Sequence, residues 1–170
     1  MWKVALDVGL NHPRPQGVET EISTYIPNAA IPHSESASAD LKKAQRSFAE
    51  SLEKDEGDAI IDNASDNIRV YRSGQLPGVG KNAAGKMLWE EDAKMTRAPS
   101  GTGITNPLDL AYEYGEYTRN RDKANERGIY LCIWRLKSDA TWKIALDLQK
   151  SAPTKNRNTL LSYRAWSRNL

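Results

Sequence analysis

The segment Ile129-Tyr130-Leu131-Cys132-Ile133-Trp134 restricts the fold most, because it is apolar on both faces of a strand. Such a strand is expected to have strands on both sides and other elements above and below it. The segments 108–117 and 142–148 alternate along their length and are rich in aromatic or aliphatic residues, as is typical of strands. Together, the three segments predict the centre of a sheet.

Helices are predicted mainly in the first half of the chain. Apolar residues recur at steps of three and four over 38–52, which indicates one helix with a single buried stripe. A second helix is expected over 58–67, a strand over 68–71 and a third helix over 82–91. The order of these elements along the chain is therefore helix, helix, strand, helix, followed by strands.

Residues 93–98 are predicted to form a strand, and 99–107 a loop or a bulged hairpin. With this strand added, four strands follow the third helix. The pattern indicates an α+β fold, in which a cone-shaped, curved antiparallel sheet packs on three N-terminal helices.

A short repeat bears on how the chain is organised. The segment Trp2-Lys3-Val4-Ala5-Leu6-Asp7-Val8 recurs as Trp142-Lys143-Ile144-Ala145-Leu146-Asp147-Leu148, with only aliphatic exchanges. We interpret the first copy as the end of a preceding repeat in a longer tandem protein; a shared strand motif is the alternative. The predicted organisation has four parts: the repeat end at 1–8, a linker at 9–36, one domain at 37–150 and a basic tail at 151–170.

Composition excludes several classes of protein. The chain has 170 residues, a single cysteine and two histidines, and both histidines lie in the predicted linker. An internal disulfide, a cysteine zinc site and a histidine-based catalytic or metal site in the domain are therefore not expected, and no cofactor is predicted. No apolar run is long enough to span a membrane, and residues 1–29 lack a secretory signal, so we predict a soluble chain of unknown compartment.

The charges are distributed unevenly. Residues 150–170 contain five basic and no acidic residues, whereas the rest of the chain has fewer basic residues than its 22 acidic ones. A nucleic-acid-binding surface on the domain is therefore not expected.

The predicted domain resembles the nuclear-transport-factor-2-like superfamily, and within it the SnoaL-like and ketosteroid-isomerase-like branch. The matching segments cover about two-thirds of the chain and are 47–55, Gly80-Lys81, 109–117, 128–134 and 142–147. The resemblance implies a cone with an apolar pocket and a homodimer formed through the sheet. It also implies activities that range from isomerase, cyclase or dehydratase chemistry to none.

Asp147 is the candidate catalytic base, because the domain has no histidine to serve in that role. Strict alternation from Trp142 places Asp147 on the face that carries Lys143 rather than on the apolar face. If that face lined the cone, burial would raise the pKa of Asp147 toward values useful for proton transfer. The alternative is a structural aspartate paired with Lys143, Arg135 or a neighbouring amide.

Four aromatic residues are the candidate ligand-binding residues. Tyr112 and Tyr114 share one face of their strand, and Tyr130 and Trp134 share one face of the next. If the two faces coincide, these side chains offer hydroxyl donors and flat walls to an apolar or aromatic ligand. Packing in the core or in a dimer interface explains them equally well.

Other residues of the same strands are assigned structural positions. Glu113 and Tyr117 fall on the face opposite Tyr112 and are expected to meet solvent or an interface. Cys132 is expected to be buried and inert.

Three functions remain open from the sequence. The chain could bind a small apolar or aromatic molecule, or transform it by cofactor-free acid-base chemistry. The third possibility is an interaction or dimerisation module whose cone is filled by its own side chains.

Overall fold

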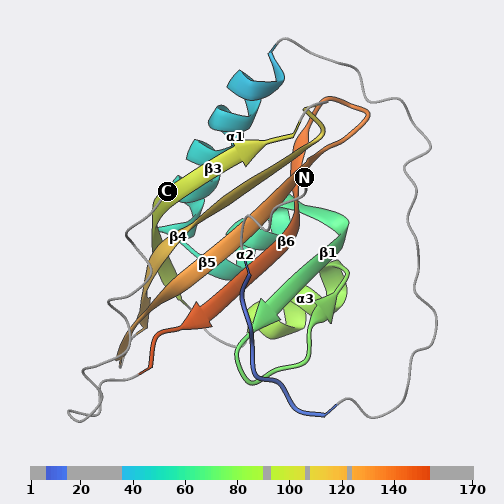
Figure 1. The fold of residues 1–170 in the computed structure, drawn as a ribbon. Helices are drawn as coiled ribbons and strands as arrows, with labels where there is room; N and C mark the ends of the chain where they lie inside the picture. The colour runs from blue at the N-terminus through green and yellow to red at the C-terminus, as the bar shows by residue number, and fades with distance from the viewer. Residues whose placement is uncertain (1–6, 15–35, 90–92, 106–107, 122–123, 154–170) are drawn as a thin grey trace.

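The computed structural model describes residues 7–14, 36–89, 93–105, 108–121 and 124–153. The helices and strands form a curved, unclosed sheet of six strands with three helices packed against one face (Figure 1). This α+β arrangement confirms the predicted fold class.

The helices cover the sheet in the predicted order, as α1 (Ala37–Leu52), α2 (Glu56–Asn63) and α3 (Lys81–Leu88). Asp55 caps α2, since its side chain accepts a hydrogen bond of 2.7 Å from the backbone of the first turn. Gly80 precedes α3 with a φ of 80°, a conformation that favours glycine. The second helix ends earlier than predicted, because a strand begins immediately after it.

The six strands lie in the order β2-β1-β6-β5-β4-β3. Their bounds are β1 (Ala64–Arg72), β2 (Gly78–Val79), β3 (Lys94–Ile104), β4 (Leu110–Arg121), β5 (Ala124–Leu136) and β6 (Trp142–Ser151). Neighbouring strands are antiparallel, except that β1 runs parallel to β6. The sheet is therefore mixed and not wholly antiparallel as predicted, because alternation along a strand carries no information about the direction of its partner.

Register shifts interrupt three of the strand pairings, and the shift in the β1–β6 pairing lies between Ala64 and Arg69. The other two are bulges. One lies in β3 between Pro99 and Gly101, within the region predicted as a loop or bulged hairpin. The other lies in β6, where Ile144 pairs with Trp134 and Leu146 pairs with the preceding residue of β5. Ala145 is thus an extra residue on β6, and such a bulge shifts the alternation of every residue that follows it.

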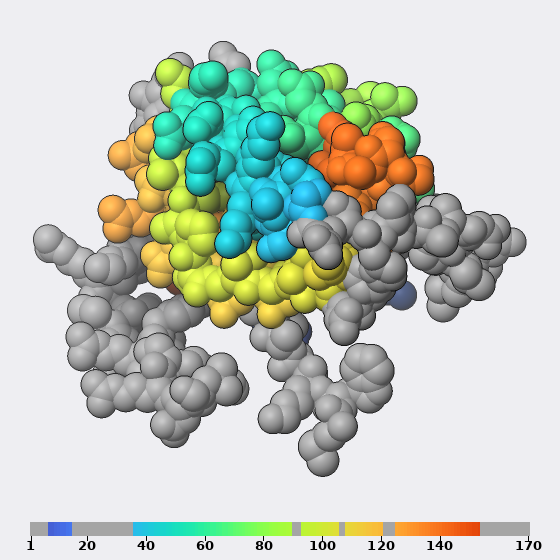
Figure 2. Space-filling view, turned by 90° about the horizontal axis from the view of Figure 1, so that it is seen from above, coloured from blue at the N-terminus to red at the C-terminus, as the bar shows by residue number. Residues whose placement is uncertain are grey.

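The core lies between α1 and the sheet. The rings of Phe48 on α1 and Trp134 on β5 meet edge to face, with centroids 5.5 Å apart. At the start of α1, the indole nitrogen of Trp142 donates a hydrogen bond of 3.0 Å to the carbonyl of Ala37. Seen from above, α1 lies between β3 and the orange end of the β5–β6 hairpin (Figure 2).

The predicted repeat end, linker and basic tail fall largely outside the described residues. Residues 7–14 are described and run beside the end of β1, where the backbone nitrogen of Gly74 donates a hydrogen bond of 2.7 Å to the carbonyl of Asn11. The tandem-repeat interpretation remains a prediction.

Candidate functional site

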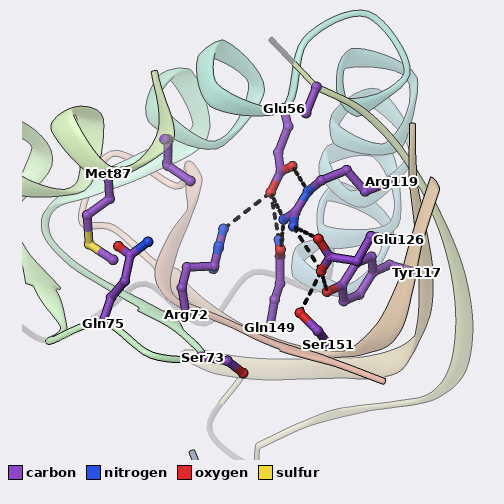
Figure 3. Close-up of a pocket in the computed structure, with 12 residues that line it drawn as sticks. Glu56, Arg72, Ser73, Gln75, Met87, Tyr117, Arg119, Glu126, Gln149 and Ser151 are labelled. Atoms are coloured by element: carbon purple, nitrogen blue, oxygen red, sulfur yellow. Dashed lines mark hydrogen bonds and ion pairs between the residues drawn. The ribbon is translucent and has the colours of Figure 1, made fainter. Parts of the chain in front are cut away.

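A cavity of about 230 Å³ lies where the ends of β1, β4 and β6 meet the start of β5, and α2 and α3 border it (Figure 3). Part of its lining is apolar and comes from Met87, Leu88 and Ala93. Most of the remaining lining is polar or charged and includes Glu56, Arg72, Tyr117, Arg119, Glu126 and Gln149.

Glu56, at the start of α2, is the centre of the polar wall. Its carboxylate accepts hydrogen bonds from Arg119 Nε at 2.6 Å and Nη2 at 2.8 Å, and from Gln149 Nε2 at 2.9 Å. Arg72 Nη2 lies 3.3 Å away. Burial by itself would raise the pKa of Glu56, but the arginines and Gln149 outweigh it and hold the pKa below its ordinary value of 4.5. Glu56 is therefore ionised at neutral pH.

Glu126, near the start of β5, extends this wall toward solvent. It accepts hydrogen bonds from Arg119 Nη1 at 3.1 Å, from the Ser151 hydroxyl at 2.7 Å and from the Tyr117 hydroxyl. Burial raises the pKa of Tyr117 to about 12, and the bond to Glu126 acts in the same direction. Tyr117 is thus a neutral hydrogen-bond donor whose proton is already engaged.

Asp147 lies behind the cavity wall and is completely buried. Its carboxylate contacts Arg97 Nη2 at 2.5 Å and Arg72 Nη1 at 2.9 Å. Burial would raise the pKa of Asp147, but the two guanidinium groups outweigh it and lower the pKa below its ordinary value of 3.8.

The ion pairs form a chain of alternating charge, which we call the charge chain. Its members, in order from the cavity mouth to the core, are Glu126, Arg119, Glu56, Arg72, Asp147 and Arg97. The inner end is the guanidinium of Arg97, whose carbon lies 5.1 Å from the ring centroid of Phe48 and 4.4 Å from that of Tyr130. Cation–π contacts with these rings partly replace water around the buried cation.

The lowered carboxylate pKa values predict that the protein loses stability in acid. Because Asp147 and Glu56 titrate below their ordinary values of 3.8 and 4.5, their contribution is fully present above those values. It is lost as the pH falls through their lower pKa in the folded state. Urea unfolding across the acid range is expected to show a free energy of unfolding that is steady down to about pH 5 and then falls. A constant value down to pH 3 would contradict the ion pairing.

The bulge at Ala145 changes the predicted surroundings of Asp147. Alternation predicted that Asp147 and Gln149 share a face with Lys143, but after the bulge they lie on the inner face, with Ile144. The structural alternative named Lys143, Arg135 or a neighbouring amide as partners of Asp147. In the structure the charged partners are Arg97 and Arg72, and the amide of Gln149 donates a hydrogen bond of 3.2 Å to Asp147 Oδ1.

Tyr112 and Tyr114 lie on the outer face of the sheet, away from the helices. In the β4–β5 register they are opposite Ile133 and Leu131, whereas Trp134 belongs to the inner face. The two tyrosine rings stack with centroids 6.4 Å apart and lie across two β3 glycines. A Cβ atom on Gly101 would come within 2.6 Å of the Tyr114 ring, so the glycine makes room for it.

Tyr130 and Trp134 lie inside the cone but do not line the cavity. Trp134 is part of the core, and the Tyr130 hydroxyl donates a hydrogen bond of 2.8 Å to Glu113. The structure therefore does not bring the four predicted aromatic residues together. Cys132 is buried beside them, and burial raises the pKa of its thiol.

The sequence interpretation missed the charged residues of the cavity. Tyr117 was assigned to the face opposite the pocket, but Tyr117 and Arg119 are both buried on the inner face. The alternation of Glu113, Tyr117 and Arg119 along one face of β4 was the available signal. That signal is weaker than the apolar character of Tyr112 and Tyr114, which predicts that their own face of β4 points inward.

The described part of the chain contains neither a cluster of metal-ligating side chains nor a membrane-spanning helix. Within 7–14, 36–89, 93–105, 108–121 and 124–153, no group of three or more histidine, cysteine or acidic side chains is placed to hold a metal ion. In the same residues, no helix combines the length and apolar character needed to cross a membrane.

Comparison with known proteins gives a likeness at the level of structure. No protein-family model matches the chain, and no curated protein matches it. A ketosteroid isomerase-like protein from Erwinia carotovora atroseptica superposes with a TM-score of 0.59 at 14% identity, covering 71% of this chain and 98% of that one.

Two further solved structures resemble the chain at a similar level. A nuclear-transport-factor-2-like protein of unknown function from Shewanella oneidensis has a TM-score of 0.53 at 15% identity, covering 66% of this chain and 97% of the other. A nuclear-transport-factor-2-like protein with a cystatin-like fold from Novosphingobium aromaticivorans has a TM-score of 0.53 at 10% identity, covering 75% and 90%. The chain therefore has the nuclear-transport-factor-2-like fold, as its sequence resemblance predicted.

Proposed function

We propose that the protein binds a small polar molecule in the cavity between the sheet and α2 and α3. The observation that carries this proposal is the convergence of charged side chains from α2, β1, β4 and β5 on one cavity of about 230 Å³. Concave sites with a few fixed polar groups are the usual places where proteins bind small ligands.

The cavity lining favours a polar ligand over the apolar or aromatic one expected from the sequence. Glu56, Arg119 and Gln149 are held by mutual hydrogen bonds and so present fixed charges and dipoles to an occupant. Fixed polar groups favour binding because little side-chain freedom is lost when the ligand arrives.

Acid-base turnover with Asp147 as the base is not part of the proposal. An efficient general base has a pKa near the operating pH, whereas the two arginines lower the pKa of Asp147. Asp147 is also fully buried and lies behind the residues that line the cavity. Its proposed role is to position Arg72, which it contacts at 2.9 Å.

Native mass spectrometry of the freshly purified chain tests the proposal. We expect a defined small-molecule adduct on the unmodified protein. Ser73 is an exposed residue of the cavity lining and is not a member of the charge chain. Ser73→Trp therefore fills the cavity with a large side chain without removing an ion pair, and it is expected to abolish the adduct.

Ser138→Trp is the matched control for the blocked cavity. Ser138 is exposed in the β5–β6 turn, at the opposite end of β6 from the cavity residue Ser151, so this variant is expected to keep the adduct. Equal retention by both variants would contradict the proposed site, as would an unmodified protein that binds no small molecule in a ligand screen.

Self-association through the outer face of the sheet is a second proposed function. The observation that favours it is an apolar row across β4 and β5, in which Ile129 is 45% and Tyr112 37% exposed, with Leu131 and Ile133 half-buried beside them. Exposed apolar patches of this kind mark interaction sites, and a second copy of the same sheet is the proposed partner.

Sedimentation velocity tests the proposed homodimer. The unmodified protein is expected to sediment as a dimer. Ile129→Lys combined with Ile133→Lys is expected to yield a monomer, because each copy would bring two lysine charges into the interface, where burying them is costly. Val79→Lys, at a 56% exposed position on β2, is the control and is expected to leave the dimer intact. A monomeric unmodified protein would rule the dimer out.

A further inference from the structure

The cavity has two chemically different walls. Figure 3 shows Met87 and Gln75 on one side, Glu126 and Tyr117 on the other, and Arg72 between them. The side near Met87 also includes the buried side chain of Leu88, which makes it partly apolar. An occupant that fits both walls has polar groups around its edge and hydrocarbon on a face.

The charges that line the cavity balance. Two carboxylates, Glu56 and Glu126, face two guanidinium groups, Arg72 and Arg119, and each carboxylate already contacts an arginine. The ion pair behind this wall is balanced as well. A ligand with a net charge would find no free counter-charge in the lining, and burying an uncompensated charge is costly. An uncharged ligand avoids this cost.

Free hydrogen-bonding capacity lies at the mouth of the cavity. The side chains of Ser73 and Gln75 make no hydrogen bond to any residue that the structure describes, and both are exposed residues of the cavity lining. A hydroxyl and an amide can each donate and accept. The complementary group on a ligand is a hydroxyl, because it can also donate to a carboxylate such as Glu126 and accept from a guanidinium such as Arg72.

We infer that the ligand is a small uncharged molecule with several hydroxyl groups on a compact carbon frame, such as a polyol or a monosaccharide. This inference rests on the proposed function and adds the chemical class of the ligand. The hydroxyl edge meets the charged wall and the mouth, and a C–H face lies toward Met87. The cavity volume of about 230 Å³ is below the roughly 300–1,000 Å³ of pockets for drug-sized ligands, which limits the occupant to this size.

Isothermal titration with a panel of small probes tests the ligand class. The panel contains myo-inositol and D-ribose as uncharged polyhydroxyl probes, malonate as an anion and putrescine as a cation. We expect at least one polyhydroxyl probe to bind while malonate and putrescine do not. Its affinity is expected to be the same at low and high salt, because screening acts on charged partners.

Gln75→Leu locates the bound probe. Removing the amide while keeping a similar size is expected to weaken polyhydroxyl binding by about three- to tenfold, the effect of one or two neutral hydrogen bonds. Ser138→Ala, in the distant β5–β6 turn, is the control and is expected to leave the affinity unchanged.

The outcomes separate the ligand class from the proposed function. Preferential binding of malonate or putrescine, weakened by Gln75→Leu, would overturn the uncharged ligand but leave the cavity as a binding site. Polyhydroxyl binding that is unaffected by Gln75→Leu would overturn the placement. Failure of every probe, together with a bare protein in native mass spectrometry, would overturn both.

Discussion

Replacing Asp147 with asparagine is expected to lower the free energy of unfolding by about 3–5 kcal/mol, the range found when one partner of a buried ion pair is removed. Asp147 is fully buried and neutralises the inner end of the charge chain. Arg97 has two side-chain nitrogens, Nε and Nη1, without a hydrogen-bond partner among the described residues, so its bond to Asp147 is hard to replace.

Urea unfolding at neutral pH measures this effect, with Asp66→Asn as the matched control. Asp66 is an exposed strand residue on β1, and its substitution is expected to change the free energy of unfolding by less than about 0.5 kcal/mol. Equal stability of the two variants would show that Asp147 does not form the buried pair.

Trp134→Ala is expected to destabilise the protein by about 3–5 kcal/mol, as is typical when a large buried aromatic side chain is truncated. Trp134 is 1% exposed and packs edge to face on Phe48, so its loss leaves a cavity between α1 and the sheet. Trp89→Ala, at a 61% exposed position after α3, is expected to cost less than about 1 kcal/mol.

The same unfolding measurement distinguishes these two tryptophans. If Trp89→Ala proved as damaging as Trp134→Ala, the core would not lie between α1 and β5. A large loss of stability for Trp134→Ala alone would support a core in which side chains fill the space between α1 and the sheet.

The order of helices and strands could be predicted because apolar periodicity is a local property. The stripe on α1 lies in the core, and the segment Ile129–Trp134 lies at the centre of the sheet. The expectation that this strand is covered on both faces is wrong, because Ile129 on the outer face is 45% exposed. The parallel pairing of β1 with β6 could not be predicted, because it depends on how distant segments meet.

The candidate site was harder to predict, for two physical reasons. A single extra residue, Ala145, reverses the face of every later residue on β6, and nothing in the local sequence marks it. The second reason is sequence separation, because Glu56 and Gln149 meet across 93 positions. The sequence therefore indicates Asp147 only as a candidate base whose burial depends on which face lines the cone, and it predicts neither the arginine partners of Asp147 nor the cavity.

The charge chain gives the cavity a fixed shape as well as polarity. Arg119 holds both Glu56 and Glu126, so one residue of β4 ties α2 to β5. A cavity built this way keeps its donors and acceptors in place when it is empty, which lowers the cost of binding.

A high-resolution crystal structure of the freshly purified protein tests the central claim most directly. The account predicts an ordered non-protein molecule in the cavity, with polar atoms hydrogen-bonded to Arg72 and Gln75 and its carbon frame toward Met87. A cavity that contains only water, both as purified and after soaking with myo-inositol and D-ribose, would contradict it.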